Sequence, residues 1–330
     1  MKKIVAFFGD RSPLFEELNQ KAKDYAASLG MEYVWAPQTP FDQADVIRNL
    51  QDADCGIIDV EPYSTPIFQE INSRCRLLVR FGVGFDKVDL PAASSFGIAV
   101  ARTTGANANA VAEMAVSLIF AARRELRLNR VQCIDTGVWA KNVANETIGS
   151  TIGILGFGNI GRITARHFKN LGCEVIAYDP YPNPKLAEEL GVELVGLEEL
   201  LKRSDAISVH VPYSPETHHM INAERLAMMK PTAVIVNTAR GGIIDEDALY
   251  DALKAHQIRG AALDVFAQEP LPNTTKLREL DNIILTPHVS SQTYESLWNI
   301  YKMAIDIAAD HFAGKDSPHI LNPDYKQFNG

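Results

Sequence analysis

Short apolar runs alternate with longer amphipathic stretches along most of the chain. The apolar runs are about five residues long and rich in Val and Ile, as is typical of strands buried on both faces of a parallel sheet. The stretches between them have the spacing of helices. We therefore predict an α/β fold with helices on both faces of its sheets. The predicted strands are Lys3–Phe8, Cys55–Asp59, Leu77–Arg80, Thr151–Leu155, Glu174–Tyr178, Ala206–His210, Ala233–Asn237, Gly260–Asp264 and Ile283–Leu285.

Two helical patterns, Asn107–Leu128 and Gln292–Phe312, are much longer than the others. We interpret them as the places where the chain crosses between two domains, since a chain of 330 residues is too long for one typical core. The predicted central domain covers residues 103–290. The predicted second domain is discontinuous and combines residues 1–102 with residues 291–330.

Composition excludes several classes of protein. Hydrophobic residues make up 46% and charged residues 22%, which is ordinary for a globular chain. The net charge of -9 gives no basic surface for nucleic acid, and no apolar stretch approaches the roughly 20 residues of a membrane span. Cys55, Cys75, Cys133 and Cys173 stand far apart, so we expect neither disulfides nor a metal site. These features predict a soluble cytoplasmic protein with no nucleic-acid or membrane partner.

A dinucleotide fingerprint follows the predicted strand Thr151–Leu155. Gly156 permits a tight turn, Gly158 allows a pyrophosphate to approach the backbone, and Gly161 lets the next helix pack closely. Asp179 ends the following strand, where its carboxylate is placed to accept hydrogen bonds from ribose hydroxyls and to repel a 2'-phosphate. A helix-packing turn is the alternative for such glycines, but strand, helix, second strand and acid all occur in register. We therefore predict NAD as the cofactor.

Arg240, Glu269 and His288 each follow a predicted strand, where open α/β sheets bind ligands. A histidine accepts or returns the hydroxyl proton near neutral pH, and a carboxylate fixes its tautomer. An arginine grips a substrate carboxylate with paired donors. Taken singly, Arg240 would be a surface ion pair and Glu269 part of a turn. Together they predict the oxidation of a hydroxy acid.

These motifs, with Val79–Asp86, Thr104–Asn107 and Ala112-Glu113, resemble the D-isomer-specific 2-hydroxyacid dehydrogenase family. The family includes phosphoglycerate, lactate, glycerate and formate dehydrogenases and the C-terminal-binding-protein corepressors. The resemblance covers nearly the whole chain. It implies a central Rossmann dinucleotide-binding domain and a flavodoxin-like substrate domain built from both chain ends. It also implies that Arg240, Glu269 and His288 are catalytic, with His288 the proton donor in reduction.

The resemblance assigns further contacts. Substrate-binding positions would be Arg240, His288 and the amides of Val83 and Gly84, although a purely structural turn at Val83-Gly84 is an equal alternative. Asp264 would bind the nicotinamide amide, with a strand-capping role as its alternative. The remaining cofactor positions are Asn159, Ile160, Val211, Pro212, Thr238 and Ala239. The family also commonly forms homodimers, and the apolar face of 107–128 suits either a core contact or a dimer seam.

The substrate is less well defined by the sequence. The sequences of Gly105–Glu113 and Asn237–Gly242 are similar to those of phosphoglycerate dehydrogenases. Asp59 and Glu61, however, stand where many of those enzymes have a basic turn, and two acids repel a phosphate. We therefore keep two substrate classes, 3-phosphoglycerate and a small unphosphorylated acid such as hydroxypyruvate, glyoxylate or a lactate-like compound. An NAD-sensing corepressor is a third, weaker hypothesis.

Overall fold

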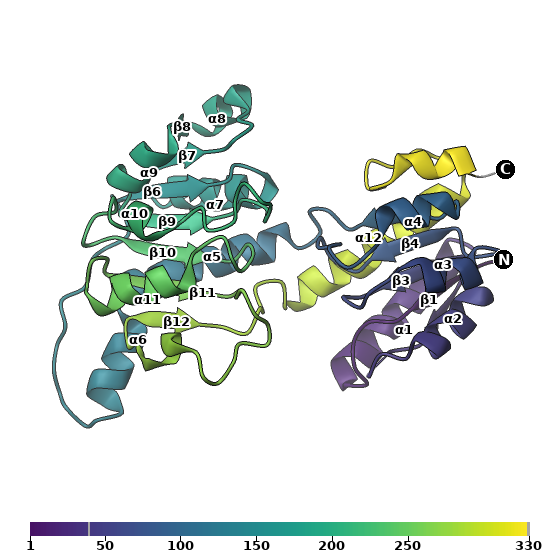
Figure 1. The fold of residues 1–330 in the computed structure, drawn as a ribbon, viewed down its shortest axis with the longest axis horizontal. Helices are drawn as coiled ribbons and strands as arrows, with labels where there is room; N and C mark the ends of the chain where they lie inside the picture. Colours follow the sequence, from purple (N-terminus) through teal and green to yellow (C-terminus); the bar gives the residue numbers. More distant parts are fainter. Residues whose placement is uncertain (39, 329–330) are drawn as a thin grey trace. The chain divides into compact units, whose positions relative to one another are not determined.

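The computed structural model describes residues 1–38 and 40–328, which fall into two compact units. The first unit comprises Met1–Asn107 and Thr293–Gly330, and the second comprises Ala108–Gln292. The boundaries predicted after residues 102 and 290 each lie a few residues before these divisions. The α/β fold class is confirmed, since both units are parallel sheets covered by helices (Figure 1).

The first unit is built on a five-stranded parallel sheet in the order β2-β1-β3-β4-β5. This is the strand order of flavodoxin-like folds, as the resemblance implies. Apolar side chains from both faces of the sheet form two cores. The strands are β1 (Lys2–Ala6), β2 (Met31–Trp35), β3 (Cys55–Ile58), β4 (Leu77–Arg80) and β5 (Ala99–Arg102).

Helices from both ends of the chain cover the first sheet. Helix α12 (Tyr294–Phe312) begins where the Thr293 hydroxyl accepts a hydrogen bond from the Ser296 amide. Its Leu297, Tyr301 and Ile305 share one stripe and pack with α1 on one face of the sheet. The other face is covered by the remaining helices of this unit. The helices are α1 (Pro13–Ser28), α2 (Gln43–Gln51), α3 (Thr65–Ile71) and α4 (Leu90–Ser95), with a 3-10 turn at Pro323–Phe328.

The second unit has a seven-stranded parallel sheet in the order β12-β11-β10-β9-β6-β7-β8. Counted along this unit, the order is that of the Rossmann fold with one further strand beside β11. The strands are short, and the three neighbouring strands β9, β10 and β11 are entirely buried. The strands of this sheet are β6 (Thr151–Leu155), β7 (Glu174–Tyr178), β8 (Glu193–Leu194), β9 (Ala206–Val209), β10 (Val234–Asn237), β11 (Gly260–Leu263) and β12 (Ile283–Leu285).

Both faces of the second sheet carry helices. The cores on the two faces are separate, one beneath α5 and α7 and the other beneath α9 and α11. The helices are α5 (Ala108–Arg123), α6 (Leu126–Asn129), α7 (Asn159–Asn170), α8 (Pro184–Leu190), α9 (Leu197–Arg203), α10 (Ala223–Leu226) and α11 (Glu246–Lys254), with a π-helical turn at Arg130–Ile134 and a 3-10 turn at Lys276–Glu279.

The predicted helix 107–128 is not continuous. Glu125 adopts a left-handed conformation (φ 52°), which ends the run of helical hydrogen bonds between α5 and α6. The contacts of the apolar face of α5 are also clear, because its Leu118, Ile119 and Ala122 pack into the core of their own unit. This face is therefore a core contact and not a dimer seam.

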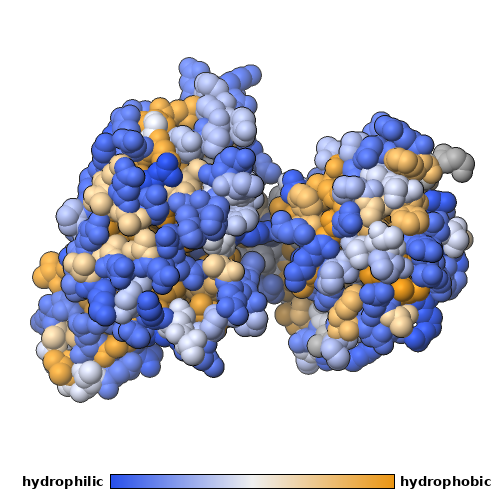
Figure 2. All heavy atoms as spheres, viewed as in Figure 1, coloured by the Kyte–Doolittle hydropathy of each residue, from blue (hydrophilic) through white to orange (hydrophobic). Residues whose placement is uncertain are grey.

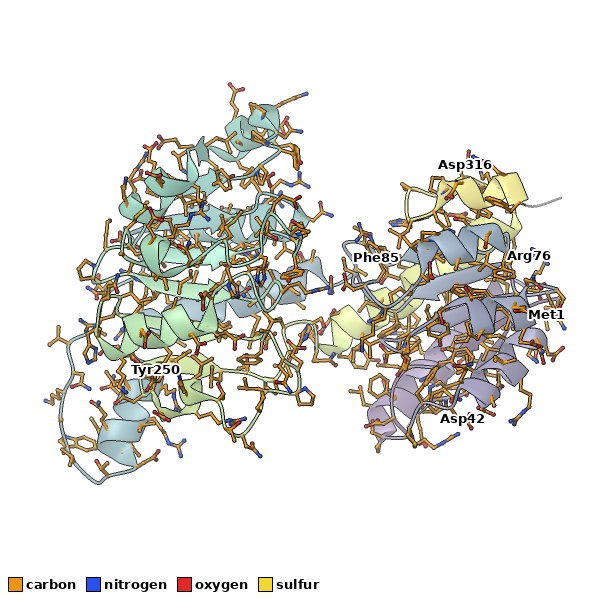
Figure 3. The ribbon with its side chains drawn as sticks, viewed as in Figure 1. Met1, Asp42, Arg76, Phe85, Tyr250 and Asp316 are labelled. Carbon is orange, nitrogen blue, oxygen red and sulfur yellow. The ribbon has the colours of Figure 1, made fainter. Side chains whose placement is uncertain are left out.

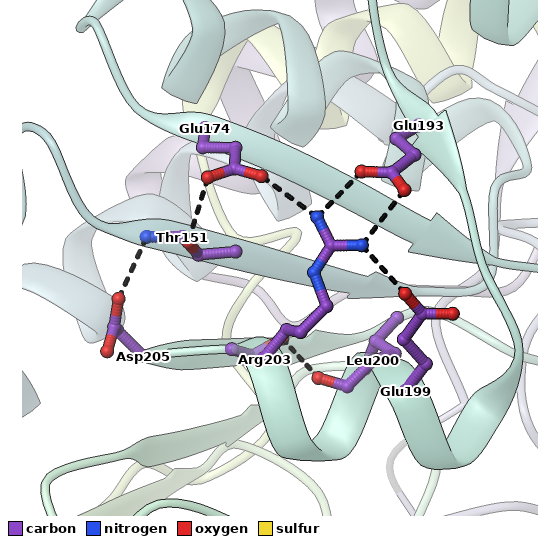
Figure 4. Close-up of polar contacts among 8 residues, drawn as sticks. Thr151, Glu174, Glu193, Glu199, Leu200, Arg203 and Asp205 are labelled. Carbon is purple, nitrogen blue, oxygen red and sulfur yellow. Dashed lines mark hydrogen bonds and ion pairs between the residues drawn. The ribbon is translucent and has the colours of Figure 1, made fainter.

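Arg203, at the end of α9, ties together the edge of the second sheet (Figure 4). Its guanidinium pairs with Glu174 on β7 at 3.0 Å, Glu193 on β8 at 2.7 Å and Glu199 on α9 at 2.8 Å. The two-residue strand β8 has few backbone hydrogen bonds of its own, and this network adds a side-chain attachment to it.

No helix in the described part of the chain is long and apolar enough to cross a membrane.

Candidate active site

The glycine loop after β6 and the Val211-Pro212 turn after β9 lie where the strand order of the second unit reverses. Arg240, Glu269 and His288 follow the next strands of the same sheet, β10, β11 and β12. Strands β6 and β9 are neighbours, although two strands and their connections separate them in sequence. Such reversal points open a crevice beyond the carboxyl ends of the strands, where α/β proteins bind ligands. At this point Gly156 meets the next loop, since a Cβ at Gly156 would lie 2.6 Å from the His210 carbonyl carbon and the Val211 nitrogen.

The three glycines after β6 have different tasks. Gly156 has φ +103°, and a Cβ at Gly161 would lie 2.0 Å from the Gly156 carbonyl oxygen, so both positions need glycine for packing. A Cβ on Gly158 would meet nothing within 4 Å. Gly158 also directly precedes the first residue of α7 and offers no capping side chain to its amides. The position therefore leaves room and free donors for an anion.

Asp179 follows β7 beside this loop. Its Oδ2 accepts a hydrogen bond from the Phe157 amide at 2.7 Å, and its Oδ1 accepts one from the Tyr181 amide at 2.8 Å. The carboxylate is half-buried. It is thus fixed directly beside the glycine loop, where the sequence analysis placed it.

Arg240 lies in a turn that Asn237 shapes. The Asn237 Oδ1 accepts from the Ala239 amide at 3.0 Å, and its Nδ2 donates to the Arg240 carbonyl at 2.9 Å. The Arg240 Nη1 donates to the Ala239 carbonyl at 2.7 Å. A Cβ at Gly241 would lie 1.9 Å from the carbonyl carbon and oxygen of Phe266, so this turn presses against the loop after β11.

Glu269 and His288 form a pair. The Glu269 Oε2 lies 2.7 Å from the His288 Nδ1, and both side chains are partly exposed, at 37% and 47%. The Glu269 Oε1 accepts a hydrogen bond from the Phe266 amide at 3.0 Å. The second ring nitrogen of His288, Nε2, is therefore the one left to exchange a proton with a bound molecule.

Asp264 is completely buried and holds the segment that carries His288. Its Oδ1 accepts hydrogen bonds from the Thr286 hydroxyl at 2.6 Å and the Val289 amide at 3.0 Å. Its Oδ2 accepts from the Ser290 hydroxyl at 2.5 Å and the Ser290 amide at 2.9 Å. Four donors of its own chain thus surround the carboxylate, and its carbonyl accepts a fifth hydrogen bond, from the His288 amide at 2.8 Å.

The remaining cofactor positions also border the carboxyl edge of this sheet. Asn159 and Ile160 open α7, Val211 and Pro212 follow β9, and Thr238 and Ala239 follow β10. The Thr238 hydroxyl is buried and has no hydrogen-bond partner among the described residues. An unpaired buried hydroxyl, uncapped helix amides and an open glycine together fit a polar, phosphate-bearing cofactor such as NAD.

In the first unit, the predicted carboxylate-binding turn follows β4. Gly82 has φ +118°, and its amide donates to the Thr103 hydroxyl at 2.9 Å. The Arg102 guanidinium lies 5.2 Å from the centre of the Phe85 ring, and its Nη1 lies 3.5 Å from the Val83 carbonyl. Phe85 is labelled in Figure 3. Val83 and Gly84 thus belong to a turn whose flanks are fixed by hydrogen bonds.

Asp59 and Glu61 follow β3 in the same unit. Arg80, the last residue of the neighbouring strand β4, forms an ion pair with Asp59 at 3.3 Å. Burial raises the pKa of the Asp59 carboxyl, and the Arg80 charge opposes this shift. Burial also raises the pKa of Glu61. Arg80 therefore compensates an acid of its own unit.

Comparison with known proteins identifies the family. The model described as "D-isomer specific 2-hydroxyacid dehydrogenase, NAD binding domain" matches residues 116–290. The chain belongs to this dehydrogenase family. Its NAD-binding domain is the second unit, and the description of the matching model confirms the predicted family and cofactor.

The relatives of this chain are named for different activities. It is 40% identical over 279 residues to the D-3-phosphoglycerate dehydrogenase of Synechocystis, covering 81% of this chain and 49% of that protein. It is 35% identical over 296 residues to the glyoxylate reductase of Korarchaeum cryptofilum, covering 88% and 89%. The chain thus spans about half the length of the phosphoglycerate dehydrogenase. Among solved structures, Escherichia coli D-lactate dehydrogenase matches with a TM-score of 0.82 and 28% identity, covering 97% of this chain and 100% of that one.

Sequence reasoning missed several residues that shape the site. Asn237 folds the Arg240 turn, and Thr286 and Ser290 fix Asp264. An asparagine at the end of a strand is a recognisable turn signal, so Asn237 was open to prediction. The contacts of Thr286 and Ser290 span more than twenty residues, and no local pattern indicates them.

Proposed function

We propose that this chain is an NAD-dependent oxidoreductase that interconverts a D-2-hydroxy acid and a 2-keto acid. The Glu269–His288 pair carries the proposal, because its 2.7 Å contact leaves one ring nitrogen free for proton transfer. The pair follows strands of the same sheet that bears the glycine loop. A dinucleotide site and an acid–base pair on one sheet edge are what a hydride-transferring dehydrogenase requires.

NADH held by the glycine loop and Asp179 would supply the hydride for the proposed reaction. His288 donates its Nε2 proton to the keto oxygen, while Glu269 holds the other nitrogen and stabilises the ring orientation. Arg240 binds the substrate carboxylate and polarises the adjacent carbonyl with its remaining N–H donors. We also assign Val83 and Gly84 to substrate binding, on the family resemblance and on their position in a glycine turn.

Cofactor binding is proposed for the residues that border the carboxyl edge of the second sheet. Asp179 would bind the ribose hydroxyls and discriminate against a 2'-phosphate. The amides that start α7 would bind the pyrophosphate. The nicotinamide assignment of Asp264 stays a prediction, and the four donors already on its carboxylate favour its backbone carbonyl or a supporting role. The full set is Gly156, Gly158, Asn159, Ile160, Gly161, Asp179, Val211, Pro212, Thr238, Ala239 and Asp264.

For the substrate, we favour a small 2-keto acid without a phosphate. Asp59 and Glu61 border the first unit's turn, and the nearby Arg80 pairs with Asp59. The glyoxylate reductase match, which covers 89% of that relative, points the same way. 3-Phosphoglycerate is the second candidate, because the phosphoglycerate dehydrogenase match has the higher identity, 40%.

We also propose that the protein is a cytoplasmic homodimer. Large apolar side chains are exposed along 126–148, including Trp139 and Val143, each 86% exposed. Hydrophobic atoms gather at the lower left of Figure 2, where Figure 1 places α6 and the segment after it. Exposed apolar surface of this kind is typical of a subunit contact. Light scattering of the purified chain tests this, and a Trp139→Asp variant should shift the mass from dimer to monomer.

The first experiment is NADH oxidation with glyoxylate, hydroxypyruvate, pyruvate and 3-phosphohydroxypyruvate, with NADPH as the control cofactor. We expect turnover of an unphosphorylated acid with NADH. The His288→Ala variant should lose at least about 100-fold in kcat while it still binds NADH, because the cofactor contacts lie in other loops. Unchanged turnover in this variant would remove His288 from the mechanism. Preference for 3-phosphohydroxypyruvate would select the second substrate class.

A further inference from the structure

The loop after β11 places Glu269, and its own backbone needs support. Residues 265–270 have no helix or strand, and Ala267 to Pro270 are exposed. The Glu269 carboxylate uses Oε1 to accept the Phe266 amide and Oε2 to contact His288. A shift of this loop therefore moves Glu269 and the histidine that depends on it.

Glu246 supports this loop from beneath. It is the first residue of α11, and its Oε1 accepts a hydrogen bond from the Ala267 amide at 2.6 Å. Two successive amides, Phe266 and Ala267, thus donate to two different carboxylates. Gly241 also approaches the Phe266–Ala267 peptide so closely that a Cβ would lie 2.4 Å from the Ala267 nitrogen. A side chain and a backbone segment thus both contact this peptide.

Helix α11 provides a rigid base for this contact. The Asp245 side chain caps it by accepting hydrogen bonds from the amides of Asp247 and Ala248, each at 3.1 Å. Leu249 and Leu253 on the same helix are fully buried. Tyr250, labelled in Figure 3, is also buried, and its hydroxyl donates to Glu279 at 3.0 Å. Glu246 is therefore anchored to a packed element and not to another loop.

We propose that Glu246 is a positioning residue, which holds the Phe266–Ala267 peptide and so fixes Glu269 against His288. This role rests on the proposed hydride-transfer function, because it acts through the Glu269–His288 pair. A hydrogen bond to a carboxylate is stronger than one between neutral groups. Supporting contacts of this kind keep catalytic side chains within the narrow range of productive geometry.

Among the groups around Glu246, the Ala267 amide contributes most to lowering the pKa of its carboxyl. Burial and the neighbouring Asp245 and Asp247 raise the pKa of Glu246. The Ala267 amide and the charge of His219, when protonated, lower it. Lys276 lies 3.8 Å from Asp247 and offsets part of the acidic charge on this turn. Loss of the amide contact would leave a carboxylate with little other support.

The first test measures the loop itself. Hydrogen–deuterium exchange of the peptide covering 264–270 should be faster in Glu246→Ala than in the wild type. Glu246→Gln keeps an acceptor oxygen and should exchange at nearly the wild-type rate. Asp247→Ala removes a carboxylate from the same helical turn without touching the loop, and it is the matched control. Glu246→Met keeps the aliphatic stem and replaces Glu246→Ala if that variant does not fold.

The second test measures the reaction. With the best keto acid, Glu246→Ala should lower kcat by about 5- to 10-fold and leave KM within about 2-fold, because positioning and not binding is lost. Glu246→Gln keeps the acceptor oxygen, so it should restore kcat to nearly the wild-type value.

Two different failures can be told apart. If the wild type reduces no keto acid, the proposed function is wrong, while the exchange experiment still reports on the loop. If the wild type is active and Glu246→Ala matches it in exchange and kcat, the positioning role is overturned. Equal effects of Glu246→Ala and Asp247→Ala would also overturn it, since they would indicate general loss of charge on α11.

Discussion

At the scale of single residues, the buried Asp264 side chain organises the chain around His288. His288 has φ 53°, a left-handed backbone conformation that residues other than glycine rarely adopt. The hydrogen bonds of Asp264 hold the residues on both sides of it, from Thr286 to Ser290. The unfavourable backbone conformation of His288 is therefore maintained by contacts that lie beneath it.

We expect Asp264→Asn to disturb this arrangement strongly. An amide nitrogen in place of one carboxylate oxygen would face the N–H donors of Val289 or Ser290 and leave a donor unpaired. The expected loss is about 2–3 kcal/mol in the free energy of unfolding and at least about 10-fold in kcat. Ser290→Ala, which removes one of the four donors, should cost about 1 kcal/mol. Denaturant titrations of the two variants check this, and equal stabilities would contradict it.

Asp179 leads to a prediction about cofactor choice. Its carboxylate is fixed beside the glycine loop by the amides of Phe157 and Tyr181. Asp179→Ala removes the negative charge that would repel a 2'-phosphate, so the ratio of kcat/KM for NADH over NADPH should fall by at least about 10-fold. Steady-state kinetics with both cofactors measure the ratio. If it does not change, another group sets the preference.

The three predicted catalytic residues share one property, which is that each lies in the loop that follows a strand of the second sheet. Arg240, Glu269 and His288 could be recognised because the strand pattern indicates where they gather. Glu246 and Ser290 could not, because they act through contacts made after the chain has folded. A charged residue at a helix start or a serine in a loop has no local feature that distinguishes it from a capping residue.

At the scale of secondary-structure elements, helix α7 and strand β6 meet through glycine. The close contact between Gly161 and the Gly156 carbonyl lets the helix start directly against the strand. Gly158, between them, makes no such contact. Packing and ligand binding therefore depend on different glycines of one motif.

This difference predicts opposite outcomes for two similar variants. Gly161→Ala places a Cβ 2.0 Å from a backbone oxygen, so it should lower the melting temperature and cost more than about 2 kcal/mol. Gly158→Ala should leave the melting temperature nearly unchanged and weaken NADH binding by at least about 10-fold, because the methyl group occupies the approach to the helix amides. Thermal unfolding and NADH fluorescence titration distinguish the two. A stable Gly161→Ala protein would contradict the packing argument.

The strands missed by the sequence analysis have identifiable reasons. Met31–Trp35 is an edge strand in which the exposed Glu32 interrupts the apolar run, and Glu193–Leu194 is a two-residue edge strand. Ala99–Arg102 lies at the other edge of the first sheet and has two small alanines. Central strands such as β6 and β10 are buried on both faces, and the apolar runs that burial requires made them predictable.

At the scale of the whole molecule, acid should destabilise the protein through His210, a histidine that is largely shielded from solvent. Burial lowers the pKa of His210 to about 3 from its ordinary 6.5, and its Nε2 lies 2.9 Å from the Ser208 hydroxyl. The folded protein thus keeps this ring neutral, whereas the unfolded chain takes up a proton below pH 6.5. The stability that the neutral ring provides is complete above pH 6.5 and is lost as the pH falls toward 3.

The corresponding experiment compares wild type with His210→Asn, which keeps a polar group near Ser208 but does not titrate. From pH 7 to pH 5, the wild type should lose about 1–2 kcal/mol more than the variant. Melting temperatures at several pH values provide the measurement. Parallel pH dependence of the two proteins would mean that other groups cause the acid sensitivity.

The discontinuous first unit has a consequence for synthesis on the ribosome. The second unit is one uninterrupted segment and is complete once Gln292 has emerged. The first unit begins earlier but needs α12, because Leu297, Tyr301 and Ile305 cover one face of its sheet. Until those last residues are made, the nascent chain displays an apolar sheet surface. The first unit therefore starts before the second and is completed after it, and its uncovered sheet is the surface that chaperones would have to protect during translation.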